Sequence, residues 1–205
     1  RFSAWYSASD QGFDPDALSA ISSNVDGLKS LSAERVGMEM IKLLSAPDPA
    51  PAVAVMRQTG VLNAVLQGAD DTWLAPLVHV ETLLELAPNP IRRLTALGGI
   101  DVEETLRLSK SQSRQLIQYR DGIGSMAGMA EVGYRSGADI AKGIYALRCA
   151  FSGAPPLTEM VDKIDSAGHA VFPIKAVHLQ DEFIGPALGQ RLKELEVEWI
   201  ASDFS

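Results

Sequence analysis

The sequence has a single cysteine, Cys149, among its 205 residues. One thiol excludes an internal disulfide framework and is typical of a reducing compartment, so we expect a cytoplasmic location. No apolar run approaches the roughly 20 residues of a membrane-spanning helix, and the start lacks the pattern of a secretory signal. These absences favour a globular chain without a membrane partner.

Basic residues are also scarce. The chain has 18 Lys and Arg against 26 Asp and Glu, which gives a formal net charge of −8. Because counterion release from nucleic acid needs clustered Lys and Arg, this balance disfavours a general nucleic-acid binder. Any RNA-binding surface must therefore be a local basic patch on a chain that is acidic elsewhere.

The alternating pattern of a half-buried strand is missing, and only residues 172–178 suit a short extended piece. Helical spacing recurs instead, between clear start and stop signals. Six helices are predicted to start at Asp14 with Pro15, Ser32, Asp48 with Pro49, Leu74, Asn89 with Pro90, and Ser109. Ser109 forms a capping box with Gln112. Further helices are predicted over 138–150, over 157–166 and from Pro186. The helix that starts at Leu74 is expected to run to Ala87. The pattern predicts an all-α array of about ten short helices.

The domain organisation is expected to break in the glycine-rich residues 123–137. We therefore predict one helical region over 1–122 and a second over 123–205. The second ends in a helix with Leu188, Leu192, Leu195 and Trp199 along one apolar stripe, which predicts that this helix is docked.

Several segments resemble bacterial class II tRNA nucleotidyltransferases (CCA-adding enzymes) and poly(A) polymerases. LSAERVGMEMIKLLSAPDPAPAVAVMRQTGVLNAVL resembles the family's neck and the opening of its body, and IRRLTALGGIDVEETLRLSKSQSRQLIQYRDG resembles the body segment that follows. FPIKAVHLQDEFIGPALGQRL resembles the entry to its tail, and the overlapping GPALGQRLKELEVEWIASDF resembles its C-terminal signature. The resemblance implies the family's all-α body and tail, with 1–122 as neck and RNA-binding body.

The family's chemistry resides in a catalytic head, where two aspartates one residue apart hold Mg²⁺ ions for attack on the α-phosphate of ATP or CTP. Asp14-Pro15-Asp16 has that spacing but reads as a helix cap with an acidic first turn. The resemblance implies that the head lies upstream of Arg1 and that the whole protein is an enzyme. For this chain alone we expect no catalytic residue, no metal site and no cofactor, and its partners are that head and the 3′ end of tRNA or another RNA.

Candidate RNA contacts come from the densest basic segment, which holds Arg92, Arg93, Arg107, Lys110 and Arg114. Lys110 and Arg114 are four residues apart and share a helix face. A serine-capped helix start beside them attracts phosphate. The alternative is an ordinary solvated face; the resemblance favours a surface that follows the acceptor stem of tRNA.

A second candidate is the turn at Gly185, with Lys175 and Arg191 near it in sequence. Small residues at a helix start let a sugar–phosphate backbone approach closely. Alternatively, the glycines permit tight packing of the last helix.

Two hypotheses remain from the sequence. The first is an RNA-binding region of a tRNA nucleotidyltransferase or poly(A) polymerase, which presents the RNA 3′ end to the head. The second is a helical protein-interaction module with no RNA role, which the net charge of −8 favours. The sequence does not distinguish addition of CCA, CC, A or a poly(A) tail.

Overall fold

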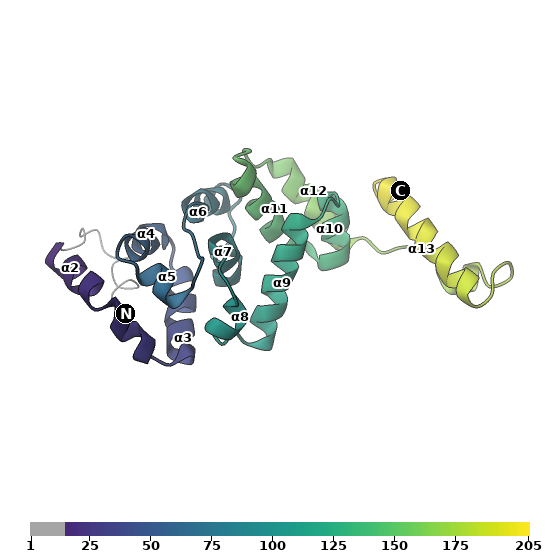
Figure 1. Cartoon of the computed structure of the whole chain (residues 1–205). Coiled ribbons are helices and arrows are strands. Elements are labelled where there is room, and N and C mark those ends of the chain that lie inside the picture. Colours follow the sequence, from purple (N-terminus) through teal and green to yellow (C-terminus); the bar gives the residue numbers. More distant parts are fainter. Residues whose placement is uncertain (1–14) are drawn as a thin grey trace. The chain divides into compact units, whose positions relative to one another are not determined.

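The computed structural model describes residues 15–205, which are all-α as predicted: they form twelve α-helices and two short 3₁₀ helices, and no β-strand (Figure 1). Contacts divide the chain into two compact units. The first comprises the described residues up to Gly124 together with Gly143–Pro156. The second comprises Ser125–Lys142 and Leu157–Ser205. A single break after residue 122 was expected, whereas the structure assigns residues 143–156 to the first unit.

The elements of the first unit are α2 (Pro15–Ser23), η1 (Val25–Ser30), α3 (Ala33–Leu44), α4 (Ala50–Gln58), α5 (Val61–Val65), α6 (Leu74–Leu83), α7 (Pro90–Leu97), α8 (Val102–Thr105) and α9 (Lys110–Gly124). Those of the second are α10 (Met129–Ser136), α12 (Thr158–His169), η2 (Ala176–His178) and α13 (Pro186–Ala201). Helix α11 (Ala138–Ser152) begins in the second unit and contributes its residues from Gly143 onward to the first.

Most predicted helix starts are confirmed, because local capping chemistry specifies them. The Ser32 side chain accepts a hydrogen bond from the Arg35 N–H, and the Asn89 side chain accepts from the N–H groups of Ile91 and Arg92. These bonds satisfy donors that the first helical turn leaves unpaired. The predicted Asp14 cap lies outside the described residues.

The boundary between the units after Gly124 falls within residues 123–137, which also hold α10. Two expectations for secondary structure were wrong. Helix α6 ends at Leu83 rather than Ala87. Residues 172–178 form a loop that ends in the 3₁₀ turn η2 instead of an extended piece. Helices α5 and α8 were not predicted, since each is too short to show a helical period in the sequence.

Helix α7 forms the centre of the first unit, where it packs against α3, α6 and α9 (Figure 1). Every residue from Ile91 to Leu97 is buried. Such a helix has no solvated face, so its two arginines must find partners inside the protein.

The second unit packs α10 against α12. A Cβ on Gly133 of α10 would lie 2.9 Å from the carbonyl oxygen of Ile164, so glycine is needed where these helices approach. Helix α13 has no fully buried residue. Its predicted stripe, from Leu188 to Trp199, is half-buried, and Trp199 packs against the rings of Tyr134, Phe172 and Phe204.

Candidate nucleic-acid interface

A groove of about 310 Å³ runs between α3 and the segment that joins α8 to α9, entirely within the first unit. Its walls are formed by Glu34, Gly37, Met38, Ile41, Lys42, Leu106, Arg107, Leu108 and Gln112. Two cations, one exposed methionine and one side-chain amide therefore meet in one groove. The residues come from parts of the chain that are about 65 positions apart in sequence.

The groove exists because α3 approaches the backbone of Leu106 without an intervening side chain. A Cβ on Gly37 would collide with the carbonyl oxygen of Leu106. The apolar face of α3, with Met40, Leu43 and Leu44, is buried toward the core. Met38 and Lys42, on the other side of the helix, are exposed.

Arg107 lies two residues after the end of α8 and has a left-handed backbone, with φ of 48°. This conformation is unusual for a residue with a Cβ and costs about 1–3 kcal/mol. Its Nε lies 3.7 Å from Oε1 of Glu34, and both side chains are more than three-fifths exposed, at 62% and 65%. Such an exposed ion pair contributes about 1 kcal/mol at most, so a phosphate can replace Glu34 at little cost.

The predicted capping box at the start of α9 is confirmed. The Ser109 N–H donates to Oε1 of Gln112 over 2.9 Å, and the Gln112 N–H donates to Oγ of Ser109 over 3.3 Å. These bonds fix the Gln112 amide at the groove wall. Its Nε2 has no acceptor among the described residues, so it remains a donor toward the groove.

Lys110 and Arg114 are exposed, and neither forms an ion pair with a described residue. Residues two apart on a helix do not share a face. Both cations therefore lie on a different side of α9 from Gln112 and the groove. The structure separates them from Arg107, with which the sequence grouped them.

The expectation that Arg92 and Arg93 contact RNA was wrong. They are 4% and 1% exposed, and both bind the buried carboxylate of Glu81, with Nε of Arg92 at 2.7 Å and NH2 of Arg93 at 2.8 Å. Arg93 also donates to the carbonyl oxygens of Leu44, Ala46 and Pro47. Because a buried charge must be paired and hydrogen-bonded, Arg93 holds α7 to α6 and to the end of α3, whereas Arg92 holds α7 to Glu81 of α6 and to the carbonyl oxygen of Ala87.

The second candidate turn lies in the second unit. Lys175 and Gly185 are exposed, and NH1 of Arg191 is paired with Glu194 at 3.2 Å and Glu198 at 3.6 Å. A Cβ on Gly185 would meet no atom within 4 Å, so tight packing does not explain this glycine; its φ of 57° does. The acidic neighbours of Arg191 weaken its attraction for phosphate.

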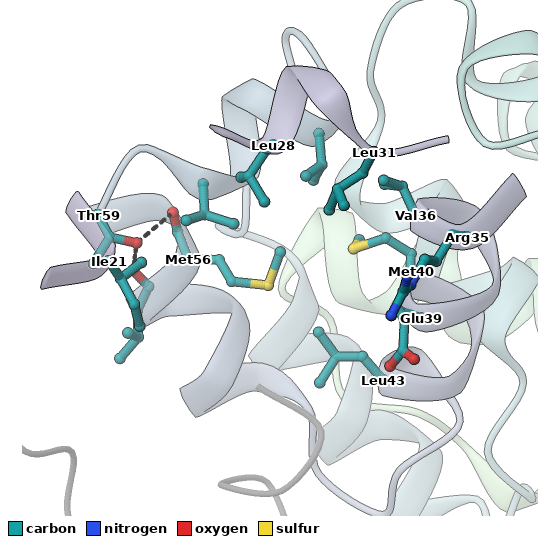
Figure 2. A pocket seen from close by; sticks show the side chains of 13 residues that line it. Ile21, Leu28, Leu31, Arg35, Val36, Glu39, Met40, Leu43, Met56 and Thr59 are labelled. Carbon is teal, nitrogen blue, oxygen red and sulfur yellow. Dashed lines mark hydrogen bonds between the residues drawn. The ribbon is translucent and has the colours of Figure 1, made fainter. Parts of the chain in front are cut away.

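A second groove, here called the apolar groove, has a volume of about 420 Å³ and opens among η1, α3, α4 and α5. In Figure 2 the labelled side chains of Leu28, Met40, Leu43 and Met56 surround it. Its remaining lining is mostly aliphatic, with Arg35 and Glu39 on the α3 side. This apolar groove suits a hydrophobic ligand surface better than a phosphate backbone.

Residues 15–205 contain no cluster of three or more His, Cys, Asp or Glu side chains that could hold a metal ion. None of their helices is both long enough and apolar enough to span a bilayer. The single thiol is buried, and burial raises the pKa of Cys149, which disfavours the reactive thiolate.

The comparison with protein families agrees with an RNA-binding role. Residues 12–72 match the model of a family described as “Probable RNA and SrmB- binding site of polymerase A”. The match supports an RNA-binding region like that of polymerase A in this part of the chain. No curated protein matches the chain.

The matched segment contains α3, which forms one wall of the groove that holds Lys42 and Arg107, here called the polar groove, and it contains every residue that lines the apolar groove. All the RNA contacts predicted from sequence lie outside it. Lys42, which lies in the matched segment, was therefore not among the candidate contacts predicted from sequence. The available signal was Met38, an apolar residue four positions before Lys42 on the otherwise polar side of α3.

Proposed function

We propose that this chain is the RNA-binding part of a polymerase A-like nucleotidyltransferase, and that it holds RNA near its 3′ end while a catalytic domain upstream of Arg1 adds nucleotides. The observation that carries the proposal is that α3, inside the segment matched to an RNA-binding family, places Lys42 beside Arg107 in one groove. Mg²⁺ and ATP or CTP would bind the catalytic domain.

The RNA backbone would be held by a few local contacts. Lys42 and Arg107 supply the charge in the groove, and Lys110 and Arg114 supply it on the adjoining side of α9. Because the chain carries a net charge of −8, long-range attraction is weak and binding should depend steeply on salt. Phosphate contacts position RNA without reading its bases, which suits tRNA as the substrate, and the single thiol suits a cytoplasmic location.

Binding of an acceptor-stem minihelix across a salt series tests the proposal. We expect log affinity to fall linearly with log salt, and the Lys42→Gln/Arg107→Gln double variant to reduce the slope by about 1.4–1.8, since each contact contributes about 0.7–0.9. Lys163→Gln, in the second unit, is the matched control and should leave the slope unchanged. Absence of minihelix binding at low salt would refute the RNA role.

The apolar groove favours a second candidate function, which is protein docking. The family's description names SrmB beside RNA, and every residue that lines the groove lies within the matched residues. An amphipathic helix with aliphatic residues on one face fits such a groove. This function corresponds to the interaction module that the net charge of the chain favours.

Titration with purified SrmB distinguishes the two functions. Leu31 lines the groove and is 43% exposed, so Leu31→Glu should fold and should abolish an interaction made there. Leu83→Glu on α6, where Leu83 is 53% exposed, is the control. Equal binding by both variants would exclude docking in this groove.

A further inference from the structure

We propose that the polar groove, between α3 and the segment that joins α8 to α9, binds one unstacked nucleotide of single-stranded RNA, with its base against Met38 and its phosphate between Lys42 and Arg107. This inference rests on the proposed RNA-binding function and specifies the form of RNA that the groove accepts. The two cations alone would suit any RNA backbone; the other groups in the groove point to a base.

Met38 is the first of these groups. It is 68% exposed, although α3 buries its other large apolar residues in the core or at groove walls. Ile41 and Leu108, which line the same groove, are half-buried. A polarizable thioether packs well on the face of an aromatic ring, and every base has such a face.

The polar groups flank this apolar surface. Lys42 forms no ion pair with a described residue, and Arg107 is held only by its exposed contact with Glu34. Gln112 presents Nε2 from an amide that the capping box fixes, so its donor can reach a base carbonyl or a phosphate oxygen without losing much side-chain freedom.

The size of the groove limits the ligand. Its volume of about 310 Å³ lies at the lower end of the roughly 300–1,000 Å³ found for small-molecule sites. One nucleotide can enter such a space, whereas a duplex must be contacted across its broad outer surface. Sequence-tolerant binding of unstacked bases is the usual way in which proteins hold single strands.

The test compares a short single-stranded oligoadenylate with an abasic ribose–phosphate oligomer of equal length, which carries the same phosphates without bases. We expect the wild-type chain to bind oligoadenylate more tightly, and Met38→Ala to reduce that preference by about twofold to tenfold. Met126→Ala changes a methionine that is 99% exposed outside the groove, so it should keep the wild-type preference. Circular dichroism verifies that both variants are folded.

The possible failures can be told apart. If neither oligomer nor the minihelix binds at low salt, the RNA-binding function fails and this inference with it. If both oligomers bind equally to the wild-type chain, the RNA-binding function stands and the nucleotide site is refuted. An unchanged preference in Met38→Ala would likewise place the base elsewhere, whereas a preference lost in this variant but kept in Met126→Ala supports the groove.

Discussion

Gly37 packs its Cα directly against the carbonyl oxygen of Leu106, and no Cβ fits between them. This contact brings α3 to the residue that precedes Arg107. Both walls of the polar groove therefore depend on one glycine in the middle of a helix. Glycine there costs about 1 kcal/mol of helix propensity relative to alanine, so the close approach has to outweigh that cost.

Gly37→Ala should consequently destabilise the protein, although alanine is the better helix former. Displacing the Leu106 backbone should cost about 1–3 kcal/mol, as overpacking usually does. Urea unfolding followed by circular dichroism measures the change. Gly27→Ala is the control, since a Cβ there would meet nothing within 4 Å; equal effects of the two variants would contradict the role of the Leu106 contact.

The buried carboxylate of Glu81 should be much more important for stability than an exposed one. Glu81→Ala leaves Arg92 and Arg93 without their counter-charge in the core, which should cost about 3–5 kcal/mol. Glu103 is paired with Arg120 at 3.3 Å near the surface, so Glu103→Ala should cost about 1 kcal/mol or less. The same urea experiment compares them, and similar losses would show that the Glu81 cluster is not needed.

Helix starts were predictable from sequence because capping is local. Ser32, Asn89 and Ser109 each use a side chain to bind a backbone N–H two or three residues later, and that chemistry is visible in the sequence. Short helices such as α5 and α8 were not predictable, since long-range packing rather than periodicity stabilises them.

The site was less predictable because burial is a property of the fold. Arg92 and Arg93 resemble surface residues until α7 is seen to be covered on every side. Conversely, Lys42 is a single lysine near the end of α3, and nothing local shows that Arg107 lies across a groove from it. The tertiary contact at Gly37 and the Glu34–Arg107 ion pair join these two parts of the chain.

Lys110 and Arg114 remain predicted RNA contacts, on the side of α9 away from the groove. The Lys110→Ala/Arg114→Ala double variant should reduce the salt slope of minihelix binding by about 1.4–1.8 if both meet phosphates. We expect no change in its preference between oligoadenylate and the abasic oligomer. Unchanged slope and affinity would identify this side of α9 as an ordinary solvated surface.

The last helix should depend on Trp199 for its docking. The Trp199 ring centroid lies 5.5 Å from that of Tyr134, 5.4 Å from Phe172 and 5.0 Å from Phe204. Each aromatic pair contributes about 0.5–1.5 kcal/mol, so loss of all three pairs in Trp199→Ala should cost about 1.5–4.5 kcal/mol. Thermal unfolding measures the loss, with Val197→Ala, which alters a 56% exposed residue of α13, as control. No difference between the variants would show that α13 is held by other contacts.

Stability of the same cluster should fall at high pH. The Tyr134 hydroxyl donates to Oε1 of Glu196 over 2.7 Å, and this bond to a carboxylate raises the pKa of Tyr134 in the folded protein. The unfolded chain, with a tyrosine pKa of about 10, loses this proton first. The contribution of Tyr134 is therefore complete below about pH 10 and disappears as the pH rises through the folded pKa.

Melting temperatures of wild type and Tyr134→Phe across this range measure the effect. Their difference should shrink as the pH rises above about 10, because phenylalanine has no hydroxyl to ionise. The remaining tyrosines titrate in both proteins, so their effects on the melting temperature cancel in the difference. A difference that stays constant would mean that the hydroxyl does not contribute through its proton.

The arginine cluster of α7 also affects how a survey of basic residues in this chain should be interpreted. Replacing Arg93 would loosen the junction between α7 and the end of α3, the helix that carries Lys42, and replacing Arg92 would loosen the junction between α7 and α6 in the same core. RNA affinity would then fall in both variants, although neither guanidinium reaches the ligand. A mutagenesis screen scored by RNA affinity alone would thus rank two core residues among the strongest RNA contacts, and a folding measurement on each variant is what distinguishes them from true ones.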